Sequence, residues 1–115
     1  YFPEIQSYLD RPKSLEELQR AVDDPQTGYQ IHHIVETQYN SGRADSNATR
    51  FAGRLEGRDN LVRVPYWKHV QISSWYSARN DLYRGLTPRA YLRGKSWGEQ
   101  YDIGLKALRQ FGVLK

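Results

Sequence analysis

Three histidines and one asparagine are the residues whose types and spacing suggest chemistry in this chain. His32 and His33 are adjacent within an apolar stretch, and His69 lies nine residues after Asn60. A histidine can bind a metal or accept a proton from water near neutral pH. Neighbouring side chains of a strand point to opposite faces, so His32 and His33 cannot share one apolar core. For the pair alone, a half-buried strand with one solvated histidine is the simpler interpretation. Asn60 and His69 favour a functional site.

The residue pattern around these positions resembles that of a known protein family. His32-His33-Ile34-Val35, Asn60-Leu61-Val62 and His69-Val70-Gln71-Ile72 resemble the pattern of HNH nucleases, also called His-Me finger or ββα-metal nucleases. The similarity is to the C-terminal domains of bacterial polymorphic, contact-dependent and colicin-type toxins. It implies an α+β fold with a small ββα-metal core, a hairpin followed by a helix, surrounded by additional helices.

The resemblance also implies a role for each matched residue. His33 corresponds to the general base, and His32 and His69 correspond to metal ligands. Asn60 corresponds to the asparagine of the motif, whose role is to fix the hairpin and orient the base. The implied reaction is hydrolysis of phosphodiester bonds, with one divalent metal ion as cofactor.

The match weakens one helical turn after His69, where colicin-type members carry another histidine and this chain has Ser73. Two protein nitrogens, completed by water and phosphate oxygens, favour Mg²⁺ or Mn²⁺, with Zn²⁺ or Ni²⁺ as alternatives. The other interpretation is that a further residue completes the site. Glu36 and Asp59 are candidate carboxylate contributors, and Ser73 itself is a candidate for a ligand or a supporting contact.

The elements that must position these residues follow from local patterns. The sequence pattern predicts two strands, at residues 27–36 and 60–64, and Pro65 ends the second. A helix from Tyr66 onward would carry His69. Residues 39–58 predict a long loop with one helical turn near 48–55, and loops of this length in small domains are usually functional.

N-cap patterns predict helices on both sides of the predicted strands and the helix that carries His69. Ser14 and Glu17 form a capping box at the start of a short helix, and Ser96 with Glu99 repeats the pattern near the C-terminus. Thr87-Pro88 is an N-cap and first-turn pair. We therefore expect a single domain over residues 1–115, with three parts: a helical lead-in at 1–26, the core at 27–80 and C-terminal helices at 86–115.

The charge distribution favours an anionic partner. The 115 residues carry a net charge of +4, with six acids and three bases in residues 1–25 but eleven bases and four acids in residues 43–95. This basic segment encloses Asn60 and His69. It is either an ordinary solvated surface or an electrostatic footprint for phosphates. The candidate phosphate contacts are Arg43, Arg50, Arg54, Arg58, Arg63 and Lys68.

The absence of cysteine excludes disulfides and thiolate catalysis. No segment has the composition of a signal peptide or membrane span. The chain lacks methionine and begins at Tyr1, which suggests a fragment of a longer polypeptide. We expect a DNase of weak sequence preference, deployed as the toxic domain of a secreted or surface-delivered bacterial protein, acting in the target-cell cytoplasm and bound by an immunity protein. The alternatives are a non-catalytic nucleic-acid-binding module and an HNH endonuclease of a restriction, homing or phage system.

Overall fold

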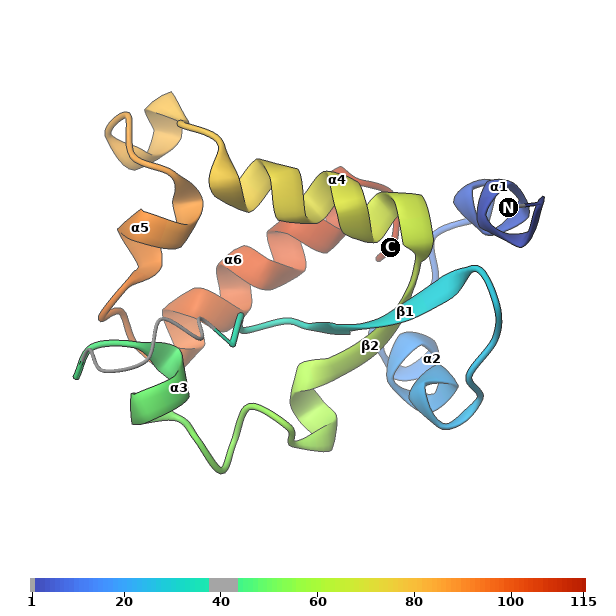
Figure 1. The fold of residues 1–115 in the computed structure, drawn as a ribbon, viewed down its shortest axis with the longest axis horizontal. Helices are drawn as coiled ribbons and strands as arrows, with labels where there is room; N and C mark the ends of the chain where they lie inside the picture. Colours follow the sequence, from blue (N-terminus) through green and yellow to red (C-terminus); the bar gives the residue numbers. More distant parts are fainter. Residues whose placement is uncertain (1, 38–43) are drawn as a thin grey trace.

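The computed structural model describes residues 2–37 and 44–115. A two-stranded antiparallel sheet lies near the middle of the molecule (Figure 1). Strand β1 (Tyr29–His33) pairs with β2 (Leu61–Pro65), with His32 opposite Val62 and His33 opposite Leu61. The two predicted strands are confirmed, although β1 is shorter than predicted. It ends at His33 because the chain bends at Ile34 and Val35.

Helix α4 (Tyr66–Ser77) begins at the residue that follows β2, as predicted. Pro65 stands at its N-cap position, where its lack of an N–H group costs no helical hydrogen bond. Ile72 and Tyr76, four residues apart, are buried on one face of the helix. This face anchors α4 on the sheet and fixes the rotation of the helix, and therefore the direction in which His69 projects.

The N-terminal part forms two short helices, α1 (Phe2–Tyr8) and α2 (Leu15–Arg20), and α2 continues into the 3₁₀ turn η1 (Ala21–Asp23). The capping box at α2 is confirmed, with both reciprocal bonds between Ser14 and Glu17 present. Helix α1 was not specifically predicted. It is fastened by a long-range contact, in which the Ser7 hydroxyl donates to the Gly28 carbonyl at 2.7 Å.

The segment between the strands contains α3 (Asn47–Arg50) and the 3₁₀ turn η2 (Arg58–Asn60). Beyond α4 come the 3₁₀ turn η3 (Asp81–Tyr83), α5 (Pro88–Leu92) and α6 (Trp97–Gln110). Thr87 and Ser96 both act as N-caps, as predicted, since each hydroxyl accepts from the backbone N–H three residues later.

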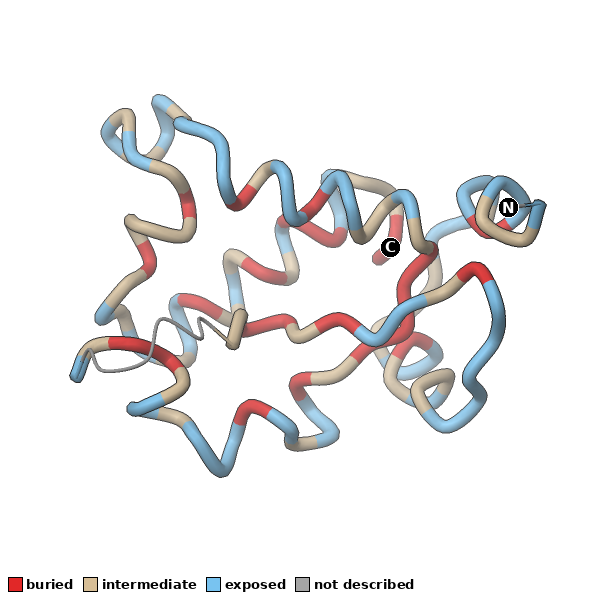
Figure 2. Tube along the Cα trace, viewed as in Figure 1, coloured by how far each residue is buried: buried red, intermediate tan, exposed pale blue. Residues whose placement is uncertain are grey.

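The core lies between the sheet, α4 and α6, and buried positions follow the inner sides of these elements (Figure 2). It is formed by Leu18, Ile34, Val62, Val64, Ile72, Tyr76, Leu92, Ala107, Leu108, Val113 and Leu114. Helix α6 passes so close to the end of β1 that a Cβ atom on Gly104 would lie 2.4 Å from the Ile34 carbonyl oxygen. Among the described residues, no helix combines the length and apolar character needed to cross a bilayer.

Candidate functional site

The imidazoles of His32 and His69 meet where β1 ends against α4. Their ring centroids are 5.1 Å apart and the rings are nearly perpendicular, at 76°. A cavity of about 110 Å³ opens beside them and is also bordered by His33. The three histidines predicted to act together are thus brought to one cavity. His32 and His33 can both border it, although they are neighbours on a strand, because β1 ends at His33.

His32 is buried, with 5% of its surface exposed, and its Nε2 has no hydrogen-bond partner among the described residues. Burial, and then the nearby charges of His69 and His33, lower the pKa of His32 to about 3. The imidazole is therefore neutral at physiological pH. A neutral imidazole is the form that binds metals.

His69 occupies the helical side of the cavity and is half-buried. Burial and the charge of His33 lower its pKa as well, so it also favours the neutral form. The part of the chain that the structure describes contains no group of three or more His, Cys, Asp or Glu side chains arranged to hold a metal.

His33 is more accessible than His32, with 25% of its side chain exposed. Its Nε2 lies 2.7 Å from Oε2 of Glu56. Glu56 was not among the residues predicted from the sequence. The contact joins positions 23 residues apart across a segment without regular periodicity, so no local pattern could have indicated it.

Asn60 is fully buried beside the cavity rather than on its wall. Its Oδ1 accepts from the Val35 N–H at 2.7 Å, and its Nδ2 donates to the carbonyls of Val35 at 3.1 Å and Leu55 at 3.0 Å. These bonds satisfy the side chain and hold the bend that follows His33.

Glu36 borders the histidine cavity, but its carboxylate is bound by Arg89 of α5, which donates through Nε at 3.0 Å and a terminal nitrogen at 2.7 Å. This paired geometry offsets the negative charge of Glu36. Arg89, which sequence reasoning missed, lies 53 positions away and also donates to the Ser77 hydroxyl at 2.6 Å.

The remaining candidates for supporting roles differ in position. Ser73 borders the histidine cavity one turn after His69, together with Thr37. Asp59 does not line this cavity and is exposed beside a second one, of about 340 Å³, next to Trp97 and Tyr101. The structure therefore brings Ser73 and Glu36 to the histidines, but not Asp59.

Each candidate phosphate contact that the structure describes already has a partner within the protein. Arg50 donates to the Lys95 carbonyl at 2.7 Å, and Arg54 stacks 4.2 Å from the Trp97 ring. Arg58 makes a paired contact with Asp23, with both side chains 65% exposed. Lys68 donates to the Gly112 carbonyl at 3.0 Å. Arg43 lies outside the described residues.

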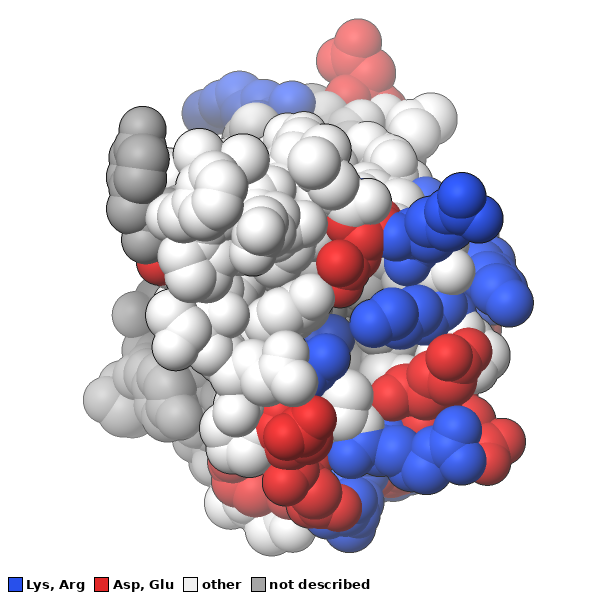
Figure 3. Space-filling view, turned by 90° about the vertical axis from the view of Figure 1, so that its right-hand side faces the viewer, with Lys and Arg blue, Asp and Glu red and all other residues white. Residues whose placement is uncertain are grey.

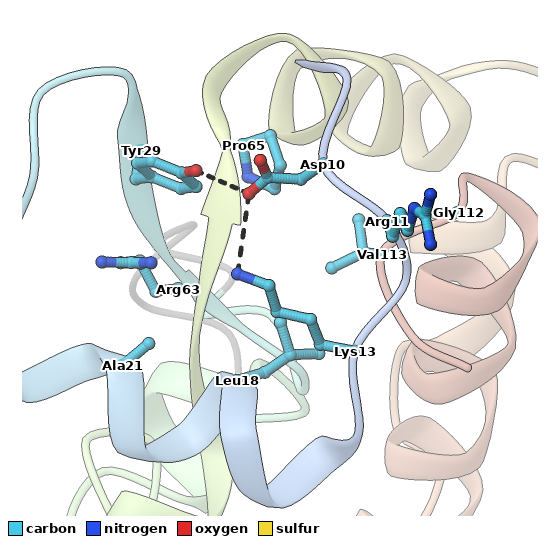
Figure 4. Close-up of a pocket in the computed structure, with 10 residues that line it drawn as sticks. All are labelled: Asp10, Arg11, Lys13, Leu18, Ala21, Tyr29, Arg63, Pro65, Gly112 and Val113. Carbon is cyan, nitrogen blue, oxygen red and sulfur yellow. Dashed lines mark hydrogen bonds and ion pairs between the residues drawn. The ribbon is translucent and has the colours of Figure 1, made fainter. Parts of the chain in front are cut away.

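Arg63 differs from the other cations because it is buried, with only 9% of its surface exposed. Its guanidinium lies 4.2 Å from the centre of the Tyr29 ring and donates to the Asp24 carbonyl at 2.8 Å. Figure 4 shows Arg63 beside Tyr29, whose hydroxyl donates to Asp10 at 2.5 Å. Burial raises the pKa of Tyr29 to about 12, and Asp10 adds to this effect. The burial of Arg63 speaks against a phosphate contact by this side chain.

Charges of both signs alternate on the side of the molecule that carries α1 and α2. Figure 3 shows Lys and Arg interleaved with Asp and Glu there, next to a broad uncharged area. Residues 1–25 carry six acids and three bases. This face is therefore not uniformly basic.

Comparison with protein families, curated proteins and solved structures gives no significant match to this chain.

Proposed function

We propose that this chain is a metal-dependent endonuclease of the His-Me finger class that hydrolyses DNA phosphodiester bonds with weak sequence preference. The observation that carries the proposal is the meeting of His32, from β1, and His69, from α4, at a cavity also bordered by His33. The element order β1, β2, α4, with β1 and β2 antiparallel, is the order that a ββα-metal core requires.

The proposed metal site fits the side chains present. His32 is neutral, and its Nε2 is buried with no hydrogen-bond partner among the described residues, a costly arrangement unless a ligand completes it. His69 faces it at 5.1 Å between ring centroids. A divalent ion held by these two residues would offset negative charge that develops on the scissile phosphate. With only two protein nitrogens, Mg²⁺ or Mn²⁺ is favoured over Zn²⁺ or Ni²⁺.

Three further side chains have separate roles in the proposed hydrolysis. His33 removes a proton from the attacking water, since an accessible imidazole can accept a proton near neutral pH. Asn60 keeps His33 in place by holding the backbone two residues further on. Exposed cations such as Arg54 exchange their intramolecular contacts for phosphate oxygens of the bound strand.

The direct test is incubation of supercoiled plasmid with the purified chain and Mg²⁺ or Mn²⁺, with and without a chelator. Chelator-sensitive cleavage is expected. His33→Ala should lower the rate by about 10²- to 10⁴-fold, because only the proton acceptor is lost. Its circular dichroism spectrum and DNA affinity should remain close to wild type.

Gln30→Ala is a matched control, since Gln30 is exposed on the same strand and does not border the histidine cavity. It should cleave DNA at the wild-type rate. If His33→Ala also cleaves at the wild-type rate, the base is assigned wrongly. DNA binding without chelator-sensitive cleavage would instead support the non-catalytic binding module.

We further propose that the domain acts as the toxic part of a larger delivered bacterial protein and is bound by an immunity protein. Only the sequence resemblance supports this step. Expression of the wild-type chain in bacteria should cause DNA degradation and growth arrest, and His33→Ala should be tolerated. A small protein encoded next to the toxin gene should bind the domain and relieve toxicity. An adjacent methyltransferase or intron gene would favour the restriction or homing alternative.

A further inference from the structure

Among the residues that the structure describes, Glu56 is the carboxylate that contacts the proposed catalytic base. We propose that Glu56 is a positioning residue that holds the His33 imidazole as its Nε2–H tautomer, so that Nδ1 carries the lone pair that accepts the proton. The inference rests on the proposed function and adds to it a residue that neither the histidine-asparagine pattern nor the charge pattern indicates.

The direction of the hydrogen bond follows from the atoms involved. An ionised carboxylate has only acceptor sites, so a 2.7 Å contact between Oε2 of Glu56 and Nε2 of His33 requires the hydrogen to reside on Nε2. In the neutral imidazole the other nitrogen, Nδ1, then has the free lone pair. A base that must take a proton from water needs this lone pair at a defined position.

Asn60 supports the contact between His33 and Glu56 through hydrogen bonds to the backbone near each of them. One of its hydrogen bonds holds the carbonyl of Leu55, the residue that precedes Glu56. Two others hold the N–H and carbonyl of Val35, two residues after His33. A single buried side chain therefore holds the backbone next to Glu56 and two residues after His33. This gives Asn60 a defined function at the site although it does not line the cavity.

The contact between Glu56 and His33 is not needed to satisfy a buried carboxylate. Its side chain is 67% exposed, and His33 is its only side-chain partner among the described residues. An exposed pair of this kind contributes little to folding stability. A carboxylate near bound DNA would also repel phosphates. Electrostatics alone therefore predicts that removing Glu56 improves DNA binding and cleavage, whereas the positioning role predicts slower cleavage.

Substitution by lysine separates these two predictions. In Glu56→Lys, an ammonium group replaces the acceptor and can only donate, which favours the opposite tautomer, with the hydrogen on Nδ1. The added positive charge should at the same time strengthen DNA binding. Glu56→Gln keeps an oxygen that can accept from Nε2–H. Glu16→Lys is the control, because it makes the same charge change at an exposed residue whose ion-pair partner is Arg20.

The first readout is the tautomer itself, measured by ¹⁵N NMR of the imidazoles in metal-free protein at mildly alkaline pH. His33→Ala assigns the His33 signals. Wild type and Glu16→Lys should show a protonated Nε2 and an unprotonated Nδ1 at His33. Glu56→Ala should show averaged shifts of exchanging tautomers, and Glu56→Lys should move toward the Nδ1–H form.

The second readout is plasmid cleavage. Glu56→Ala should lower kcat by about 10- to 100-fold, the loss seen when the partner that orients a metal-binding histidine is removed, while KM should be no higher than that of the wild type. Glu56→Lys should be at least as slow although it binds DNA more tightly. Glu56→Gln should lie closer to wild type, and Glu16→Lys should keep the wild-type kcat.

The outcomes separate the two proposals. Two outcomes would overturn the role of Glu56 and leave the nuclease proposal standing. In the first, Glu56→Lys cleaves DNA faster than the wild type. In the second, the wild-type protein cleaves DNA but His33 carries its hydrogen on Nδ1. A wild-type protein that shows the Nε2–H tautomer but never cleaves DNA overturns the nuclease proposal, and with it any catalytic use of Glu56.

Discussion

His32 and His33 are adjacent, yet their surroundings give them different chemistry. His32 is buried against Val62 and His69 and is held neutral, whereas His33 is partly exposed and hydrogen-bonded to a carboxylate. Strand alternation predicts that the two side chains differ in direction. It cannot predict how deeply each is buried, because burial depends on α4 and on the turn that carries Glu56. The proposed ligand and base roles agree with the resulting difference.

The low pKa of His32 makes stability depend on pH. The unfolded chain binds a proton at this histidine below its ordinary pKa of 6.5, but the folded protein does not until the pH approaches about 3. Stability is therefore lost as the pH falls through this window. Between pH 7 and 4.5 the loss from His32 should be about 2 to 3 kcal/mol.

Urea unfolding of metal-free protein, with chelator present, measures this effect. In His32→Gln the unfolding free energy should fall less steeply over the same pH range, because glutamine does not titrate. Carboxylates contribute equally to both proteins, so the difference between the slopes isolates His32. Parallel slopes would show that the pKa of His32 is the same in the folded and unfolded protein, and would contradict the lowered value.

At the scale of elements, local patterns predict most of what positions the histidines. The stop at Pro65 and the N-caps at Ser14, Thr87 and Ser96 act over a few residues, and each is confirmed. The strand β1 forms as predicted, but its burial does not alternate, since Gln30 and Ile31 are both exposed. Contacts that join distant segments leave no such pattern. The Arg89–Glu36 and Glu56–His33 pairs depend on how α5 and the inter-strand segment fold back, so they become visible only in three dimensions.

The approach of α6 to β1 gives a prediction at this scale. A Cβ atom at Gly104 would meet the Ile34 carbonyl oxygen at 2.4 Å and its Cγ2 at 2.7 Å, next to His33. Gly104→Ala should therefore force the helix away and lower the unfolding free energy by about 1 to 3 kcal/mol or more. The displacement should also reduce cleavage, because Ile34 follows the proposed base.

Gly98 provides the control within the same helix, since a Cβ atom there would meet nothing within 4 Å. Gly98→Ala should change stability by less than about 1 kcal/mol, in the favourable direction that helix propensity predicts. Thermal unfolding of both variants tests the comparison. Equal stability of the two alanine variants would show that α6 can shift without cost.

At the scale of the whole molecule, the basic segment does not act as a uniform surface. Folding buries Arg63 under Tyr29 and pairs Arg58 with Asp23, while the side bearing α1 and α2 has charges of both signs (Figure 3). Sequence totals count these cations equally, because burial is not visible in composition. DNA affinity should therefore depend on a subset of them, in which exposed Arg54 belongs and Arg63 does not.

Salt dependence of DNA binding distinguishes the two arginines. Each phosphate contact releases a counterion, so Arg54→Ala should reduce the slope of log affinity against log salt by about 1. Arg63→Ala should leave this slope unchanged and instead lower stability by about 1 to 3 kcal/mol, since it removes a buried donor from the Asp24 carbonyl and a cation from the Tyr29 ring. Fluorescence anisotropy with a short duplex measures the slopes at a temperature where circular dichroism shows both variants folded.

The opposite result would be a reduced slope for Arg63→Ala and a normal slope for Arg54→Ala. It would mean that DNA binds next to β2 and that Arg63 leaves its buried position to contact a phosphate.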